Sequence, residues 1–367
     1  MIVYLIYYIL FGLLTFIEDK VKNLPSKKIL VKIITVFSFI LLVFLIGMRW
    51  RTGTDWDPYY YFFYWSFSRG FFEPDSYMDY GYVLFNNFCY FINDNYSFLL
   101  ILHAFIFYFC LYKFYALFTK NVIFAVFLYT VMFFGMVGSN RQLLAVSCTC
   151  LALYFYLKPN YKVAVLFFLI SVSFHITAVL SLLFIFFNRK YDVKYILLFF
   201  IIAYFIGNSG IIENLFALVG TTGDTNEGKV EAYKDATGAG TELSIIGIIR
   251  RVTMVVLLIY YSSVLRKKFK YFDLCLNSYL YTVAGFLIFG SIPILAGRGM
   301  LYFTIFEPIL LMYLLIMLSK FTIKPLKYLL IGVIVILFFF QSINLYPELF
   351  IPYQGIFINT IHFRYMN

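Results

Sequence analysis

A group of six arginines and a histidine occupies positions within or at the ends of strongly apolar stretches, where a charged side chain is costly. They are Arg49, Arg51, Arg141, Arg250, Arg251, Arg298 and His175. The planar guanidinium group of arginine can form two parallel hydrogen bonds to a phosphate. Several arginines at one depth, on separate helices and without carboxylates beside them, would repel one another unless an anion joined them. The group therefore predicts a site for a phosphate or pyrophosphate.

Each of these residues also has a simpler interpretation when it is taken alone. An arginine near a membrane surface often extends its charged end to the lipid headgroups. We expect this of one member of the Arg250–Arg251 pair. A single histidine on an apolar face, such as His175, is usually a hydrogen-bonded core residue. The arginines as a group nevertheless favour the anion site.

The segment 49–59 supplies carboxylates close to two of the arginines. Arg49 and Arg51 begin it, Gly53 permits a turn, and Asp55 and Asp57 follow. The two carboxylates could be general bases, ion-pair partners of the arginines or turn residues before a proline. For Asp55 the sequence favours the pairing role slightly over catalysis.

The same segment carries aromatic side chains with flat apolar faces and polar edges, which suit sugar rings. The candidates for sugar binding are Trp50, Trp56 and Tyr59. The alternative is the belt of aromatic residues that membrane proteins place at the interface between lipid and water, and it fits equally well.

The composition indicates that lipid is the main solvent of the chain. Of its 367 residues, 63% are hydrophobic and 13% are charged, whereas a soluble chain carries about 25% charged residues. The net charge of +11 comes largely from lysines in short loops between apolar segments, which fits membrane topology and not a nucleic-acid partner. The lipid bilayer is the predicted partner.

Ten apolar runs are long enough to span a bilayer, which takes about 17–25 residues. They are 2–17, 29–48, 96–118, 121–137, 139–157, 195–219, 244–264, 273–296, 300–318 and 327–345. The N-terminal run lacks the basic start and the cleavage site of a signal peptide and should remain as a helix. We therefore predict an all-α integral membrane protein, a single polytopic domain over residues 1–367 with about 10 full transmembrane helices.

Lysines and arginines divide the connecting segments into two sets. One set, near residues 20–32, 120, 158–162, 189–194, 266–270 and 320–327, is rich in them and should face the cytoplasm. Loops 49–95 and 220–243 are mixed in sign and should face outward, together with both termini. The isolated arginines then lie in the outer third of the bilayer.

The run 163–187 is interrupted by His175 and lies between two segments that should both be cytoplasmic. A single crossing would invert every later loop. We therefore predict a re-entrant helical hairpin with His175 at its turn, and the alternative is one long tilted helix. Each arm has about 12 residues, or about 18 Å, which is too short for a full span.

Motifs for other chemistries are missing from the sequence. It contains no glycine-rich phosphate loop, no zinc-binding His-Glu-x-x-His pattern and no Gly-x-Ser-x-Gly elbow. The five cysteines lie mostly inside apolar runs and form neither a disulfide framework nor a zinc site. We expect no metal and no cofactor.

Several motifs, in order along the chain, together resemble those of EpsG-type, Wzy-like bacterial polysaccharide polymerases. They are Arg49-x-Arg51-Thr-Gly-Thr-Asp55 with Tyr59-Tyr60, Asn140-Arg141-Gln142-Leu-Leu-Ala145, Phe174-His175-Ile-Thr-Ala178, Arg298 with Tyr302-Phe303, and Ile351-Pro352-Tyr353-Gln354. Order and spacing agree over nearly the whole chain. Thr177 is a mild departure, since a serine is more often expected there.

The resemblance implies a multi-spanning, metal-independent glycosyltransferase at the outer face of the bacterial cytoplasmic membrane. Its substrates would be oligosaccharide repeats linked to undecaprenyl pyrophosphate, and a flippase and a chain-length regulator of the same pathway would be its partners. Arg49, Arg51, Arg141, Arg250 and Arg298 would bind the pyrophosphate, and Arg141 and Arg298 would also act in catalysis. His175 is the leading candidate to act as base or to orient the acceptor, and Asp55 is the second.

Rival functions are a ligase or an acyltransferase acting on surface glycans and, from another class, a flippase for lipid-linked oligosaccharides. A flippase should show internal two-fold repeats and a charged path through the whole bilayer. The sequence shows neither, which favours the enzyme. Loop 220–243, with its glycines and acidic residues, could act as a lid over the site.

Thr222→Cys and Asn367→Cys should each react with a membrane-impermeant thiol reagent in intact cells, because both positions are predicted to face outward. The unmodified chain, with its five native cysteines, is the control. Protection of both positions until the cells are permeabilised would contradict the predicted topology.

Overall fold

The computed structural model describes residues 2–75, 77–220, 245–318, 324–344 and 346–357. Every element named within these ranges is an α-helix or a 3-10 helix, which confirms the all-α class. The chain forms two compact units. Unit 1 comprises Met1–Ala178 and Thr322–Asn367, and unit 2 comprises Val179–Phe321.

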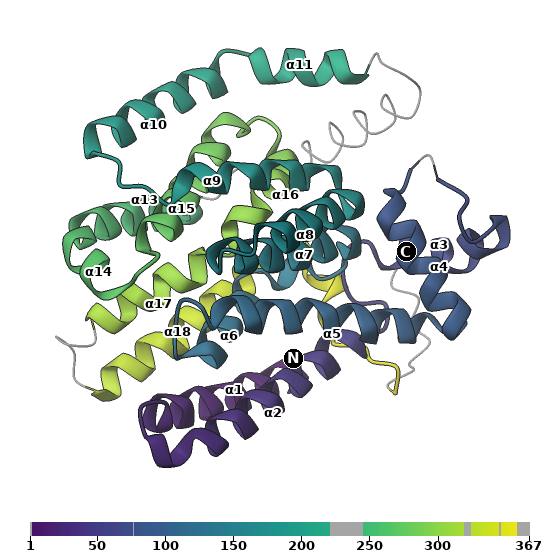
Figure 1. Ribbon diagram of the computed structural model, residues 1–367, viewed down its shortest axis with the longest axis horizontal. Helices are drawn as coiled ribbons and strands as arrows, with labels where there is room; N and C mark the ends of the chain where they lie inside the picture. Colours follow the sequence, from purple (N-terminus) through teal and green to yellow (C-terminus); the bar gives the residue numbers. More distant parts are fainter. Residues whose placement is uncertain (1, 76, 221–244, 319–323, 345, 358–367) are drawn as a thin grey trace. The chain divides into compact units, whose positions relative to one another are not determined.

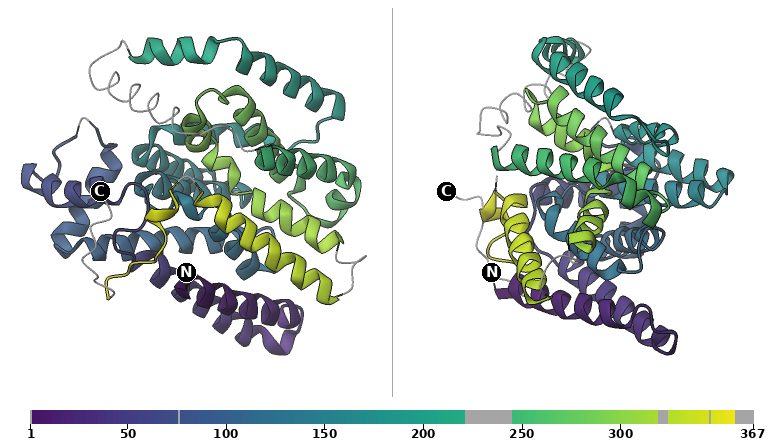
Figure 2. Two further views of the ribbon diagram at one scale, coloured as in Figure 1. Left: turned by 180° about the vertical axis from the view of Figure 1, so that it is seen from behind. Right: turned by 90° about the vertical axis from the view of Figure 1, so that its left-hand side faces the viewer.

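Unit 1 begins with two apolar helices that run side by side in opposite directions (Figures 1 and 2). Its α-helices are α1 (Ile2–Val21), α2 (Lys28–Gly47), α3 (Trp56–Arg69), α4 (Tyr80–Ile92), α5 (Tyr96–Tyr115), α6 (Val122–Met132), α7 (Asn140–Leu157), α8 (Tyr161–Phe174) and α18 (Lys324–Ser342). The core lies around α5 and α7, because α5 packs against both α2 and α7 while α8 packs along α7. Asn95 is the N-cap of α5, and its side chain accepts a hydrogen bond from the Ser97 N–H at 2.9 Å.

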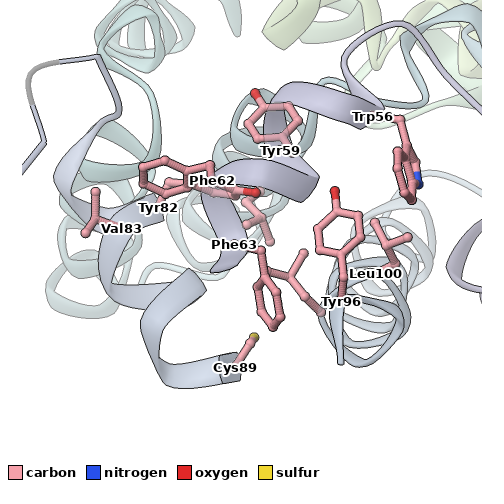
Figure 3. Close-up of a cluster of buried hydrophobic side chains, with 11 residues drawn as sticks. Trp56, Tyr59, Phe62, Phe63, Tyr82, Val83, Cys89, Tyr96 and Leu100 are labelled. Atoms are coloured by element: carbon pink, nitrogen blue, oxygen red, sulfur yellow. The ribbon is translucent and has the colours of Figure 1, made fainter. Parts of the chain in front are cut away.

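The segment 49–95 contains two helices that pack together, so most of it is not an open loop. Helices α3 and α4 share a buried cluster with the start of α5, drawn in Figure 3. Its labelled members are Trp56, Tyr59, Phe62, Phe63, Tyr82, Val83, Cys89, Tyr96 and Leu100. Aromatic rings in contact, such as Tyr59 and Tyr82 with centroids 5.2 Å apart, give this small hairpin a core of its own.

Two glycines allow the segment after α2 to touch the turn before α7. A Cβ atom on Gly53 would lie 2.2 Å from the carbonyl oxygen of Val137, and one on Gly138 would lie 2.9 Å from the backbone nitrogen of Thr54. Both glycines have positive φ, +108° and +124°. The motif at 49–55 is therefore in direct backbone contact with the turn that precedes the motif at 140–145.

The C-terminal motif of the chain packs against the same segment. The Trp50 N–H donates to the carbonyl of Gln354 at 2.9 Å, and the Ile356 N–H donates to that of Met48 at 2.9 Å. The Tyr353 hydroxyl donates to the carbonyl of Leu45 at 2.8 Å. Three motifs that lie far apart in the sequence thus meet in unit 1.

Unit 2 is built around α15 (Phe272–Ile288), which packs against six other helices. The unit contains α9 (Phe184–Phe187), α10 (Val193–Asn208), α11 (Ile211–Gly220), α13 (Ile245–Tyr260), α14 (Ser262–Lys268), α16 (Pro293–Thr304) and α17 (Glu307–Leu318). Those that contact α15 most are α10, α16, α9 and α17. Close approach of α10 to α15 needs Gly207, where a Cβ would lie 2.0 Å from the Leu287 carbonyl oxygen.

Three described helices are long and apolar enough to cross a membrane, or up to five if each of two bent helix pairs counts as one span. The three are Ile2–Val21, Pro25–Gly47 and Tyr96–Tyr115, and the bent pairs are α13 with α14 (70°) and α16 with α17 (54°). The predicted ten full spans are not confirmed. Several apolar runs are broken by turns, such as the one at Gly210 between α10 and α11, where φ is +72°.

The run 163–187 is also broken where the sequence predicted a turn. Helix α8 ends at Phe174, His175 is extended (φ −162°, ψ 122°), and a 3-10 helix, η3 (Ile176–Leu183), follows. This break excludes one continuous helix and leaves the re-entrant hairpin as a prediction. Except for Gly220, the proposed lid at 220–243 lies outside the described residues.

Gly53→Ala should lower the melting temperature of the detergent-solubilised protein far more than Gly70→Ala does. Both positions have positive φ, so alanine strains the backbone at either one. A Cβ at position 70, however, would have no atom nearer than 3.8 Å, whereas at position 53 it would overlap Val137. We expect an extra loss of about 1–3 kcal/mol at position 53. Equal losses would show that the contact with Val137 is unimportant.

Candidate functional site

Arg141, in the first turn of α7, is held by three acceptors from the α3–α4 region. Its Nε donates to the Tyr59 hydroxyl at 3.2 Å, and its Nη1 donates to the Tyr77 carbonyl at 3.2 Å and to Oδ2 of Asp79 at 2.8 Å. The side chains of Arg141 and Asp79 each remain 21% exposed. These bonds leave Nη2 without a hydrogen-bond partner among the described residues, so a ligand can reach a fixed guanidinium group.

Tyr59 contributes a neutral hydroxyl to this arrangement. Burial raises the pKa of the phenol, and the neighbouring Arg141 acts in the opposite direction. The phenol therefore keeps its proton near neutral pH. Its oxygen accepts from Arg141 while its O–H hydrogen can be donated elsewhere.

His175 lies at the break after α8 and is oriented by Thr177. Its Nδ1 is 3.3 Å from the backbone nitrogen of Thr177 and 2.7 Å from the Thr177 hydroxyl. A backbone N–H can only donate, so Nδ1 accepts and the neutral ring carries its proton on Nε2. Thr177 supplies the same hydroxyl group that a serine would supply at this position. The hydrogen bond to His175 is therefore kept despite the departure from the family pattern.

The first turn of α4 brings His175 and Arg141 to the same part of unit 1. Asp79, the residue before α4, forms the ion pair with Arg141 and does not cap its own helix. Two residues later, Gly81 approaches Ser173 so closely that a Cβ would lie 2.4 Å from the serine Oγ. Tyr59, Asp79, Arg141 and His175 with Thr177 thus form the candidate site.

Arg49 is placed differently from its prediction as a pyrophosphate ligand. Its side chain is 1% exposed, and it donates to the Ile46 carbonyl at 2.7 Å and to Oδ1 of Asn140 at 2.8 Å. A phosphate could reach it only after the surrounding helices had moved. This burial favours a structural role for Arg49.

Arg51 and Asp55 lie on the turn between α2 and α3 and are partly exposed. Arg51 has a φ of +45°, which is uncommon for a residue with a side chain and occurs often at functional turns. Asp55 stands at the N-cap of α3 without a side-chain capping bond. Both remain candidates for contacts with the substrate.

Two of the three aromatic residues predicted to bind sugar face the protein core. Trp56 is 2% exposed and Tyr59 is 5% exposed, while Trp50 is partly buried against Trp56 at a centroid distance of 4.8 Å. The exposed rings of α3 belong instead to its opposite face, where Tyr61 is 69% and Trp65 is 50% exposed. The sequence pattern could not tell these faces apart, because every residue from 59 to 65 is aromatic.

The arginines of unit 2 have partners that the sequence analysis did not identify. Nη1 of Arg250 donates to Oε1 of Glu307 at 2.7 Å, and Glu307 is almost fully buried. The guanidinium carbon of Arg251 lies over the ring of Phe286, 4.0 Å from its centroid. The premise that carboxylates are missing beside the arginines is therefore wrong for both Arg141 and Arg250.

Arg298 lies inside helix α16, one residue before the buried Gly299. The sequence analysis had placed it in a connection between two spans. The breaks in the helix come instead at 289–292 and 305–306, on either side of α16. Arg298 is partly exposed, and its role in binding pyrophosphate stays a prediction.

Asp79, Asn140 and His103 were missed by the sequence analysis although they hold the arginines in place. No feature of the sequence pointed to Asp79, because the segment 49–95 was expected to be a loop and Asp79 pairs with a residue far away in the chain. Among the residues that the structure describes, no three His, Cys, Asp or Glu side chains are grouped so that they could hold a metal ion.

Comparison with protein families gives a match over residues 32–355, which runs from α2 to the C-terminal motif. The chain belongs to the EpsG family. Comparisons with curated proteins and with solved structures gave no match. EpsG membership suggests a role like that of a polysaccharide polymerase, and together with the apolar helices it indicates a membrane protein.

Thr177→Val should reduce activity of this EpsG protein several-fold, whereas Thr177→Ser should leave it close to normal. Valine has the shape of threonine but lacks the hydroxyl that holds Nδ1 of His175. Losing one such hydrogen bond is worth about 0.5–1.5 kcal/mol. Polymer formed per unit of membrane-inserted protein is the measurement, and equal activity of the two variants would contradict the orienting role.

Proposed function

We propose that this protein polymerises undecaprenyl-pyrophosphate-linked oligosaccharide repeats into a surface polysaccharide, either an O-antigen, a capsule or an exopolysaccharide. The reaction takes place at the outer face of the bacterial cytoplasmic membrane. The growing chain leaves its lipid pyrophosphate and joins a hydroxyl group of the next lipid-linked repeat. The observation that carries the proposal is the partly exposed Arg141, fixed by Tyr59 and by Asp79 at the end of α4 that contacts Ser173, two residues before His175.

In this reaction, the bond between the anomeric carbon of the donor sugar and the pyrophosphate oxygen breaks. Undecaprenyl pyrophosphate leaves with the electron pair, so negative charge develops on the leaving oxygen. A guanidinium group that is already fixed in position stabilises this charge without having to reorganise. Nη2 of Arg141 suits this role, because Nε and Nη1 are used to hold the side chain.

The hydroxyl of the acceptor sugar forms the new bond and loses its proton. With its proton on Nε2, His175 orients the acceptor and does not remove that proton. The Asp79 carboxylate, which lies against Arg141, is a group on this side of the site that can accept it. Asp55 is a second carboxylate for the same task. Arg51 and Arg298 are further candidates for binding the pyrophosphate.

The experiment that tests the function is the chain length of surface glycan on a gel, from a strain that lacks this protein and carries single variants of it. Arg141→Lys keeps the charge but loses the planar fork. It should reduce the rate about 10²–10³-fold, as expected for a lost contact to the transition state, while the protein inserts normally. His175→Ala should cost less than this.

Arg69→Lys is the matched control, because Arg69 also forms an ion pair in the α3–α4 region, with Asp75 at 3.0 Å, and is 36% exposed. Its polymer should be normal. Near-normal polymer from Arg141→Ala at wild-type protein level would overturn the proposal. The arginines would then be interfacial residues, and the flippase alternative would be favoured.

A further inference from the structure

Asn140, at the start of α7, has all four of its polar groups bonded to other parts of unit 1. Its N–H donates to the Gly138 carbonyl at 2.7 Å, and its own carbonyl accepts from Nε2 of His103 at 3.0 Å. Its Oδ1 accepts from Nη2 of Arg49 at 2.8 Å, and its Nδ2 donates to the Tyr96 hydroxyl at 3.3 Å. The side chain is fully buried. Asn140 therefore joins the end of α2, two positions on α5 and the start of α7.

The network around Asn140 is costly to maintain. Arg49 brings a charge into the protein interior, and the two groups that accept its side-chain hydrogen bonds, the Ile46 carbonyl and the Asn140 amide, are neutral. Nε of Arg49 and Nδ1 of His103 are buried without a hydrogen-bond partner among the described residues. A buried polar network that is only partly satisfied is less stable than an apolar core. Its presence here indicates a function other than stability.

The residue that follows Asn140 in the chain suggests what this other function is. Arg141 is the next residue, and both belong to the first turn of α7, where N–H groups have no partner within the helix and the backbone frays readily. Ser139, at the N-cap, makes no side-chain capping bond. The bonds to Asn140 therefore anchor the uncapped first turn and set the direction in which Arg141 leaves the helix.

We propose that Asn140 is a positioning residue which, held by Arg49, His103 and Tyr96, fixes the Arg141 guanidinium group against Tyr59 and Asp79. This inference rests on the proposed function only in giving Arg141 its task. A displacement of about 1 Å at a reacting group can cost about 10²-fold in rate. Arg49 then serves the reaction through Asn140 and does not contact the substrate.

The direct test measures how fast Arg141 reacts with phenylglyoxal, an arginine-specific reagent, by mass spectrometry of the purified full-length protein. In the wild type Arg141 should react slowly, because Tyr59 and Asp79 hold it. In Asn140→Leu, which has a similar size and no polar groups, it should react at least several-fold faster. Arg69 serves as the internal reference, and its rate should not change.

Two variants separate positioning from general loosening of the fold. Asn140→Asp keeps the Oδ1 acceptor and gives Arg49 a carboxylate, so Arg141 should stay protected and polymerisation should persist. Asn277→Ala removes a buried amide of unit 2 that donates to the Phe187 and Arg189 carbonyls at 2.6 and 2.7 Å. It should leave the Arg141 rate unchanged. An Arg141 rate that rises equally in Asn277→Ala would overturn the inference.

Polymerisation gives an independent readout. Asn140→Ala should lower the rate about 10–100-fold in the wild-type background and should add no further loss to Arg141→Ala, because it acts through Arg141. A further loss there at equal protein level would contradict the inference. Altered Arg141 reactivity with normal polymerisation would uphold the positioning and refute the proposed function. If Asn140→Leu fails to insert, His103→Phe removes the bond to the Asn140 carbonyl, and an unchanged Arg141 rate in that variant would overturn the proposal.

Discussion

The burial of Arg49 constrains much of unit 1. A guanidinium group that has left water must have its N–H groups bonded, or the fold loses more free energy than the surrounding contacts supply. The Ile46 carbonyl at the end of α2 and the Asn140 amide at the start of α7 bond Nη1 and Nη2, and Nε has no partner among the described residues. These two acceptors belong to different helices. The Arg49 side chain therefore fixes the end of α2 relative to the start of α7. Helix α5 joins them through His103 and Tyr96.

The segments around Arg49 are shaped to permit this arrangement. The turn at Gly53 and Gly138 brings two backbones closer than any side chain would allow. The C-terminal motif then covers the segment from the other side, with Trp50 bonded to Gln354. These contacts explain why motifs from both ends of the chain belong to one family pattern. They build a common support for Arg141, even though few of their residues are near enough to touch a substrate.

Residue type and hydropathy predicted part of this structure. Helices α1, α2 and α5 follow directly from apolar runs, and the break at His175 follows from the charges on either side of its run. The number of spans did not follow, because hydropathy records composition and not the backbone turns at Gly210 or 289–292. Partners of the arginines could not be predicted either. Asp79 and Arg141 are 62 residues apart, so only the packing of α4 against α8, which lies along α7, brings them together.

Arg49 and Arg51 illustrate the limit of a motif most clearly. Their types and their neighbours are almost the same, yet one is buried under the helix ends and the other lies on a partly exposed turn with positive φ. A pattern with two arginines separated by one residue identifies the pair, but the direction of each side chain depends on the turn that Gly53 and Gly138 create. The chemical role of each arginine is therefore set by tertiary contacts.

The carboxylate beside Arg141 also affects how strongly the site would bind substrate and how readily it would release product. An unpaired arginine would bind a pyrophosphate strongly both before and after the reaction, and tight binding of the ground state does not raise the rate of the chemical step. Asp79 satisfies Arg141 while the site is empty, so an arriving anion must compete with an existing ion pair. The net attraction is then weaker for the bound substrate and for the released product. Under the proposed function this competition favours product release, because the Asp79 carboxylate pairs with the guanidinium group again as the pyrophosphate leaves.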